Sequence, residues 1–142
     1  MKKIPVDLED LQMAFETAFD EVQQFLDKET GKVLFHSEDM PMEMMPEDED
    51  WEADEAFMAR YLLIPQDDSW EGYADMEAFI DTVTDPILQD KLAIAIDGSG
   101  AFRRFKNVLL GEPERERWFQ FKNERVQRRV VEWLALEGFE PA

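Results

Sequence analysis

Hydrophobic residues near the start of the chain recur with the spacing of a helix. Leu8, Leu11 and Phe15 are separated by three and four positions, which places them on one helical face. Asp7 precedes this stripe and Asp10 lies in its first turn, where exposed amides and the helix dipole favour carboxylates. The pattern predicts a short amphipathic helix from about Leu8 to Phe15 or a little beyond.

Two short apolar runs rich in Phe, Val and Leu follow, at 23–27 and 32–36. The turn between them ends in Gly31, which is typical of a β-hairpin whose glycine adopts a positive φ. A third apolar run, at 61–64, is ended by Pro65. These runs predict a small, mostly antiparallel sheet of about three strands.

An acidic segment rich in Met and Pro, residues 37–50, separates the hairpin from the third run. Its two prolines and its acidic run argue against regular structure before about Asp48, so we expect a mobile loop. Its methionines suit either an adaptable contact surface or gap filling against the core. The acids around Asp50 would also sit well at the N-terminus of a helix from Trp51 to about Arg60.

The second half of the chain has helical spacing throughout. Glu71 lies three residues after Asp68, as in a capping box, and Asp85 precedes Pro86, a typical helix start. We expect four helices, with inward-facing residues that include Phe102 and Phe105 in the third and Phe119, Val126, Val130, Trp133 and Leu134 in the fourth. The helices are expected from Asp68 to about Val83, from Asp85 to Gly98, from Ser99 or Gly100 to Gly111, and from about Glu114 to Glu137.

These elements predict an α+β fold, in which a small antiparallel sheet packs against a predominantly helical C-terminal half. A chain of 142 residues that is 44% hydrophobic can bury a core of ordinary size, so we expect residues 1–142 to form a single domain.

Charge and composition narrow the possible partners. The chain has 34 acidic and 15 basic residues, a net charge of −19 that repels nucleic acid and anionic membranes at long range. No cysteine is present, which excludes disulfides and thiolate metal sites. The two N-terminal lysines precede no apolar stretch, and no run approaches transmembrane length, so we expect a cytoplasmic protein with another protein as partner and no membrane contact.

The sign of the charge changes along the chain near Gly98. Residues 1–56 carry a net charge of −14 and residues 57–98 one of −7, whereas residues 99–142 carry +2. Because the acidic and basic parts share one fold, much of the basic surface could face the chain's own carboxylates.

The stretch at this reversal is a candidate anion site. Backbone groups of Gly98, Ser99 and Gly100 could approach a phosphate or carboxylate closely at a helix N-terminus, with Arg103, Arg104 and Lys106 supplying charge. Alternatively, the glycines form a helix-to-helix corner and the arginines pair with nearby acids, which is the interpretation we favour.

A second candidate surface lies on the last helix. Four residues recur at i, i+4, i+7 and i+11 on one flank, namely Trp118, Lys122, Arg125 and Arg129. Such a flank could stack a nucleic-acid base, anchor a protein partner, or dock the acidic segment of the same chain.

No arrangement of residues in the chain indicates catalysis. The sequence lacks a phosphate-binding P-loop, a dinucleotide fingerprint, a nucleophile elbow and a paired-histidine metal motif. His36 is the only histidine, and the acidic run lacks the spacing of a calcium loop, so strand-end packing is the better account of His36. We therefore expect no enzyme activity, no cofactor and no metal.

Several segments of the chain match the pattern of a known bacterial family. The most specific is the string from Gly98 to Lys106. The others are Phe25–Val33, Ile64-Pro65, Tyr73, Met76-Glu77, Phe79-Ile80, Trp118, Phe121 and Trp133-Leu134. By these residues the chain resembles the uncharacterised family numbered 0158, for which no activity is established. The resemblance covers roughly residues 8–139 and does not extend to Met40–Asp50, which we expect to be particular to this chain.

The leading functional prediction is a non-enzymatic, cytoplasmic protein-interaction or adaptor module that uses the basic aromatic face of residues 99–129. The alternative is binding of nucleic acid or a phosphate ligand at Gly98–Lys106, which the net charge disfavours. A third possibility is an acidic mimic of nucleic acid, which would need an ordered array of carboxylates.

Overall fold

A computed structural model describes residues 2–17, 21–47, 50–66 and 69–142 of the chain. Its contacts divide the chain into two compact units: a sheet unit formed by residues 1–66 and 126–142, and a helical unit formed by residues 67–125. The prediction that residues 1–142 form a single domain stays a prediction.

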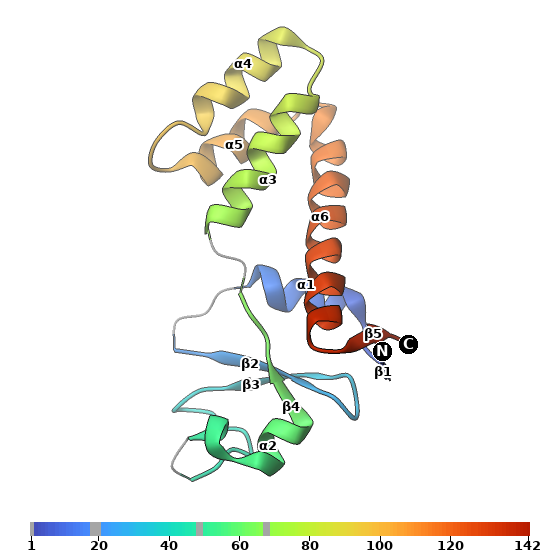
Figure 1. The fold of residues 1–142 in the computed structure, drawn as a ribbon. Coiled ribbons are helices and arrows are strands. Elements are labelled where there is room, and N and C mark those ends of the chain that lie inside the picture. Colours follow the sequence, from blue (N-terminus) through green and yellow to red (C-terminus); the bar gives the residue numbers. More distant parts are fainter. Residues whose placement is uncertain (1, 18–20, 48–49, 67–68) are drawn as a thin grey trace. The chain divides into compact units, whose positions relative to one another are not determined.

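The described elements combine short strands with helices that dominate the second half (Figure 1). This arrangement confirms the predicted α+β class. In chain order the elements are β1 (Lys2–Ile4), α1 (Leu8–Glu16), β2 (Gln23–Asp27), β3 (Val33–His36), the 3-10 turn η1 (Trp51–Ala53), α2 (Glu55–Arg60), β4 (Tyr61–Leu63), α3 (Ser69–Thr82), α4 (Pro86–Ala95), α5 (Ala101–Leu109), α6 (Glu114–Leu136) and β5 (Phe139–Pro141).

The predicted sheet is present, with the strand order β3-β2-β4 and both pairings antiparallel. Phe25 on the central strand lies opposite Leu34 on one side and Leu63 on the other. Gly31 closes the hairpin with a φ of 75°, as expected. A side chain would not fit there, because a Cβ on Gly31 would lie 1.6 Å from the carbonyl oxygen of Pro5.

The two faces of this sheet are covered by different elements (Figure 1). Leu26 and Ile64 face α1 and the last turns of α6, where they join a cluster of buried residues. Phe25 and Tyr61 face the other way, against α2. The first cluster contains Ile4, Leu11, Ala14, Phe15, Leu26, Ile64, Val126, Val130 and Leu134.

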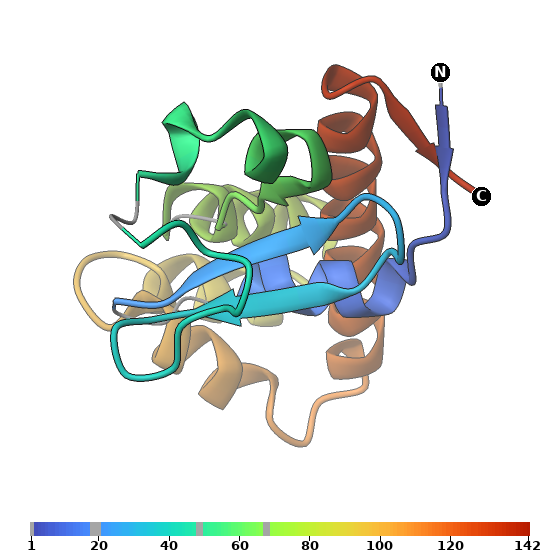
Figure 2. The ribbon, with the colours of Figure 1, turned by 90° about the horizontal axis from the view of Figure 1, so that it is seen from below.

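A second, two-stranded sheet joins the beginning of the chain to its last residues (Figure 2). β1 and β5 are parallel, with Lys2 opposite Phe139 and Ile4 opposite Pro141. Neither strand was predicted from the sequence, since each has three residues and its partner lies at the other end of the chain.

The predicted helix start at Asp7 is confirmed. Its carboxylate accepts hydrogen bonds from the backbone N–H groups of Glu9 and Asp10, at 2.9 and 3.4 Å. The single helix predicted from Trp51 to Arg60 is wrong in its first half, because Asp54 ends η1 and caps α2 by accepting from the Phe57 N–H at 2.9 Å.

The helical unit packs α3, α4, α5 and the first turns of α6 around Phe79, which is fully buried. Asp85 caps α4 as predicted, by accepting from the Ile87 N–H at 3.0 Å. Phe105 and Leu109 of α5 face the core, but Phe102 was predicted inward and is 42% exposed. The buried stripe of α5 runs through Ala101 instead, one position earlier. Asp68, expected to cap α3, lies outside the described residues.

Residues 37–47 form turns and bends without helix or strand. Met42 and Met45 pack against the cluster on the α2 face of the sheet, whereas Met40 and Met44 are 78% and 59% exposed. Two methionines of the segment thus fill gaps beside the core, and two others are exposed to solvent. Its mobility stays a prediction.

Candidate functional site

The turn at residues 98–100 is a corner between α4 and α5. Gly98 and Gly100 both have a positive φ, of 87° and 79°, and Gly100 rather than Ser99 occupies the N-cap of α5. The Gly100 cap has no side chain to bond the first amides. The helix-corner interpretation is therefore supported by the backbone geometry.

Arg104 holds this corner together. Its Nε donates to the carbonyl of Ala95 at 2.8 Å and its Nη2 to that of Asp97 at 2.7 Å, while Nη1 donates to Ser99. These carbonyls lie in the last residue of α4 and just after it, where unsatisfied acceptors favour a cation. Arg104 therefore serves its own turn, and the expected pairing with nearby acids is replaced by pairing with backbone carbonyls.

The other two cations of the stretch, Arg103 and Lys106, are exposed on α5. A shallow pocket of about 390 Å³ lies between α4 and α5. It is lined by Lys91, Ile94, Ala95, Arg104, Asn107 and Val108. The binding role predicted for Gly98, Ser99, Gly100, Arg103, Arg104 and Lys106 stays a prediction.

Trp118 is not part of an exposed flank, so its predicted placement is wrong. It is 6% exposed and its ring contacts Phe105 and Phe79, at centroid distances of 4.8 and 5.3 Å. Phe119 was predicted inward but is 39% exposed, beneath the guanidinium of Arg115 at 4.8 Å. The prediction is therefore wrong only in the first turns of α6, since Val126, Val130 and Leu134, also predicted inward, are fully buried.

Arg125 is paired with a carboxylate inside the helical unit. Its Nε donates to Oδ1 of Asp75 at 2.6 Å, and the Asp75 side chain is 2% exposed. Lys122 is half-buried in the same unit, whereas Arg129 belongs to the sheet unit. The residues of the predicted flank thus have different environments. Trp118 lies in the core and Arg125 in an ion pair, whereas Lys122 and Arg129 belong to different units.

The described part of the chain contains no group of side chains that could hold a metal ion. Within residues 2–17, 21–47, 50–66 and 69–142, no three histidine, aspartate or glutamate side chains converge as a metal would require. His36 is buried at the end of β3, where its Nδ1 accepts from the Met42 N–H at 3.1 Å. No described helix combines the length and the apolar character needed to cross a bilayer.

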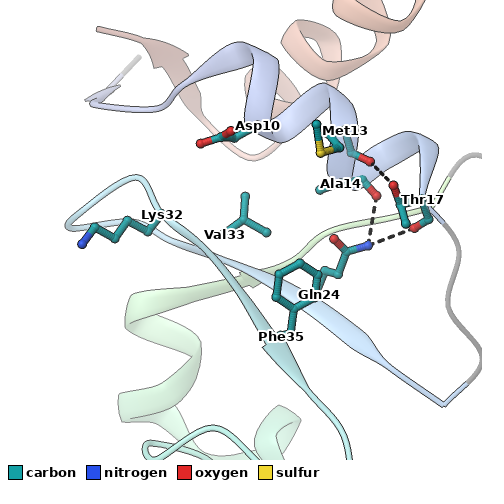
Figure 3. A pocket seen from close by; sticks show the side chains of 8 residues that line it. All are labelled: Asp10, Met13, Ala14, Thr17, Gln24, Lys32, Val33 and Phe35. Carbon is teal, nitrogen blue, oxygen red and sulfur yellow. Dashed lines mark hydrogen bonds between the residues drawn. The ribbon is translucent and has the colours of Figure 1, made fainter. Parts of the chain in front are cut away.

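A pocket of about 500 Å³ opens in the sheet unit between α1 and the hairpin (Figure 3). Met13 of α1 and Phe35 of β3 face it and are 66% and 54% exposed. Eight residues line it: Asp10, Met13, Ala14, Thr17, Gln24, Lys32, Val33 and Phe35. An open apolar pocket with a few polar groups is the usual form of a binding site.

The polar groups of this pocket lie at its two ends (Figure 3). At one end, the buried amide of Gln24 donates from Nε2 to the carbonyls of Ala14 and Thr17, both at 3.0 Å. At the other end, Asp10 and Lys32 extend from α1 and the hairpin. Because these hydrogen bonds link Gln24 of β2 to the end of α1, they hold the two sides of the pocket, α1 and the hairpin, at a fixed spacing.

A second pocket, of about 590 Å³, adjoins the first and shares Val33 and Phe35 with it. Its further lining residues are Val22, Leu34, Ser37, Met40 and Pro41. We call the two pockets together the β3 groove. No single motif in the sequence marks this groove, although the exposed Met40 belongs to the methionine segment that we considered as a contact surface.

A buried carboxylate fixes the far end of the hairpin. Asp27 Oδ2 accepts from Nη2 of Arg60 at 3.0 Å, and Oδ1 accepts from the Glu29 N–H at 2.9 Å. Burial by itself would raise the pKa of Asp27, but these hydrogen bonds, with one from Thr30, outweigh burial and lower it. Pairing with Asp27 raises the pKa of Arg60 in turn, although desolvation opposes this. The pair is structural and lies outside the β3 groove.

Comparison with known proteins agrees with the resemblance found in the sequence. The model of the uncharacterised protein family UPF0158 matches residues 1–142. This match spans the whole chain, whereas the resemblance found in the sequence covered roughly residues 8–139; that Met40–Asp50 is particular to this chain stays a prediction. No solved structure matches.

Relatives in the same family come from several bacteria. A UPF0158 protein of Pseudomonas aeruginosa is 27% identical over 100% of this chain and 89% of its own length. UPF0158 proteins of Chlamydia muridarum and Chlamydia trachomatis are 30% identical over 89% of this chain, which spans only 38% and 39% of their lengths. The family description and these names assign no activity. The chain belongs to the uncharacterised protein family UPF0158.

Proposed function

We propose that the chain is a protein-interaction module and that the β3 groove is its contact surface. The observation that carries this proposal is the exposure of three large apolar side chains along one groove: Met13, Phe35 and Met40. Exposed apolar side chains gathered at one place are typical of surfaces that bind other proteins. The groove replaces the basic aromatic face of residues 99–129 as the leading candidate surface.

The geometry supports binding rather than catalysis. The groove has apolar walls, and the Gln24 amide at one end of its first pocket is already bonded to backbone carbonyls. Its charged groups, Asp10 and Lys32, lie at its end. We place the interaction in the cytoplasm, which a chain without cysteine suits.

The proposal is tested with a photo-crosslinking amino acid placed at Met13 in living cells. Met58 is the matched control, since it is also an exposed methionine on a helix of the sheet unit, but it lies outside the groove. We expect a defined adduct from position 13 and not from position 58, and we expect it to disappear when Phe35→Ser is added. Equal adducts from both positions, or an adduct that survives Phe35→Ser, would contradict the proposal.

A further inference from the structure

We propose that the β3 groove binds an extended, cationic segment of a partner protein, which adds to the sheet as a fourth strand beside β3. This inference rests on the proposed function and specifies the chemistry of the partner. It follows from the direction of backbone groups, from the alternation of side chains and from charge.

The backbone register shows which peptide groups face the open side of β3. The Gln24 carbonyl accepts from the Ile64 N–H at 2.8 Å, so Gln24 bonds toward β4, and so does Leu26 two residues later. Leu26 lies opposite Val33. Because a residue of an antiparallel ladder bonds to one side only, the N–H and C=O of Val33 point away from β2. Since β3 ends the strand order and no strand of the described residues pairs with its other side, they point to an open edge.

The pockets along this edge fit alternate side chains. Successive residues of a strand point to opposite faces, yet Val33, Leu34 and Phe35 all line the second pocket, which therefore runs along the strand edge. The first pocket lies on the α1 face of the same strand. A strand laid beside β3 would thus place every second side chain against Met13 and Phe35, so it needs apolar residues at alternate positions.

Charge decides between possible occupants. The sheet unit has 21 acidic and 7 basic residues, a net charge of −14. Asp10 lines the first pocket, and Glu38 and Asp39 lie between two residues that line the second, whereas Lys32 is the only basic residue among the lining residues given for the two pockets. This field attracts a segment with basic residues at the alternating polar positions, and it repels a second copy of the chain or a nucleic acid.

The probe is a capped octapeptide of alternating lysine and valine, and the control peptide replaces lysine with glutamate. We expect the lysine peptide to bind the full chain, to shift the Val33 amide resonance, and to bind at least tenfold more weakly at 300 mM than at 50 mM NaCl. The glutamate peptide should not bind. Binding without a shift at Val33, equal binding of the two peptides, or no binding of the lysine peptide would overturn the inference.

Methylated peptides test strand pairing from the ligand side. In an added strand only every second N–H faces β3, so either the valine amides or the lysine amides bond to it. N-methylation of the set that faces β3 should abolish binding. N-methylation of the other set should change the affinity by no more than about threefold. If both methylated peptides bind as the unmodified peptide does, side chains alone are recognised and strand addition is wrong. The same holds if both fail.

Variants of the chain supply the complementary test. Val33→Pro removes an N–H that points outward, and Leu63→Pro does the same on the opposite edge, because Leu63 lies opposite Phe25 in β4 and likewise faces away from β2. We expect at least tenfold weaker peptide binding in the first variant and unchanged binding in the second. A variant that fails to fold leaves the methylated peptides as the deciding measurement.

The outcomes separate this inference from the proposed function. A Met13 adduct together with failure of the lysine peptide would overturn the cationic strand and leave the interaction module standing. Sedimentation of the chain alone adds a second check. A dimer that Val33→Pro dissociates would show that a second copy, rather than a cationic segment, occupies the edge, and it would overturn the inference.

Discussion

At the scale of single residues, Asp27 makes stability depend on pH in a defined direction. Because the pKa of Asp27 is lower in the folded chain than in the unfolded one, its contribution is complete above its ordinary pKa of about 3.9 and is lost as the pH falls through the folded value. We predict that Asp27→Asn lowers the free energy of unfolding at pH 7 by about 1–3 kcal/mol, with the deficit shrinking at acid pH. Urea unfolding from pH 7 to 2.5 measures this.

The control for this prediction is Glu29→Gln, since Glu29 approaches the same guanidinium of Arg60 at 3.6 Å but is 67% exposed. Exposed pairs contribute little, so we expect a change below about 0.5 kcal/mol. Parallel stability curves for the Asp27→Asn variant and the unchanged chain at all pH values would contradict the assignment.

Asp75 and Arg125 form the second residue-scale pair. Arg125→Met leaves the Asp75 carboxylate, which is 2% exposed, without its guanidinium, and we predict a loss of about 3 kcal/mol in the free energy of unfolding. Adding Asp75→Asn should recover part of the loss, since no buried charge then remains. Arg128→Met, an exposed change in the same helix, should stay within about 0.5 kcal/mol. An Arg125→Met chain as stable as Arg128→Met would refute the pairing.

At the scale of elements, two glycines allow the effect of a steric clash on stability to be distinguished from the effect of a positive φ. Gly31 and Gly98 both have positive φ, but a Cβ at Gly31 would strike the Pro5 carbonyl, whereas nothing lies within 4 Å of one at Gly98. We predict a loss of about 1 kcal/mol for Gly98→Ala and of more than about 3 kcal/mol for Gly31→Ala. Thermal and urea unfolding of both variants measure the difference, and equal losses would contradict it.

The turn between α4 and α5 gives a second prediction at this scale. Arg104→Met removes four hydrogen bonds to the carbonyls at the end of α4 and in the turn, so we expect a loss of about 1–3 kcal/mol. Arg103→Met, on the exposed side, should cost less than about 0.5 kcal/mol. The free energy of unfolding in urea checks both. A larger effect from Arg103→Met would show that the exposed residue has a structural role.

How much the sequence predicts at this scale depends on how local each signal is. α1, the hairpin and α4 follow from caps and turns within a few residues of Asp7, Gly31 and Asp85, and all three are confirmed. The sequence could not predict which of Trp118 and Phe119 faces the core, because two adjacent aromatic residues fit an apolar stripe equally well. Only packing against Phe79 decides between them. The pairing of β1 with β5 has no local signal at all.

The candidate site was the least predictable part, for a related reason. Each of Met13, Val33 and Phe35 reads as an ordinary apolar residue of a helix or strand. Their common groove arises only when Gln24 fastens α1 against the hairpin. Conversely, the sequence favoured pairing of Arg104 with nearby acids, and only the fold shows that it bonds to the carbonyls of its own turn instead.

At the scale of the whole molecule, the net charge of −19 should oppose folding by self-repulsion. We predict that the urea midpoint rises between 20 and 300 mM NaCl, because salt screens the repulsion. The double variant Glu38→Lys with Asp39→Lys should flatten this dependence, whereas Glu38→Asp with Asp39→Glu, which keeps the charge, should not. A midpoint that falls with salt would show that attractive ion pairs outweigh the repulsion.

The two units also differ in when they can form during protein synthesis. Residues 67–125 are consecutive, so the helical unit can assemble as soon as they leave the ribosome. The sheet unit needs Val130 and Leu134 to complete the buried cluster that contains Ile4. Translation at about 5–20 residues per second makes these residues roughly 3–15 s after residue 66. During that interval the nascent chain exposes Leu11 and Leu26 without their cover, which makes the first 66 residues the part that a chaperone on the ribosome would meet unprotected.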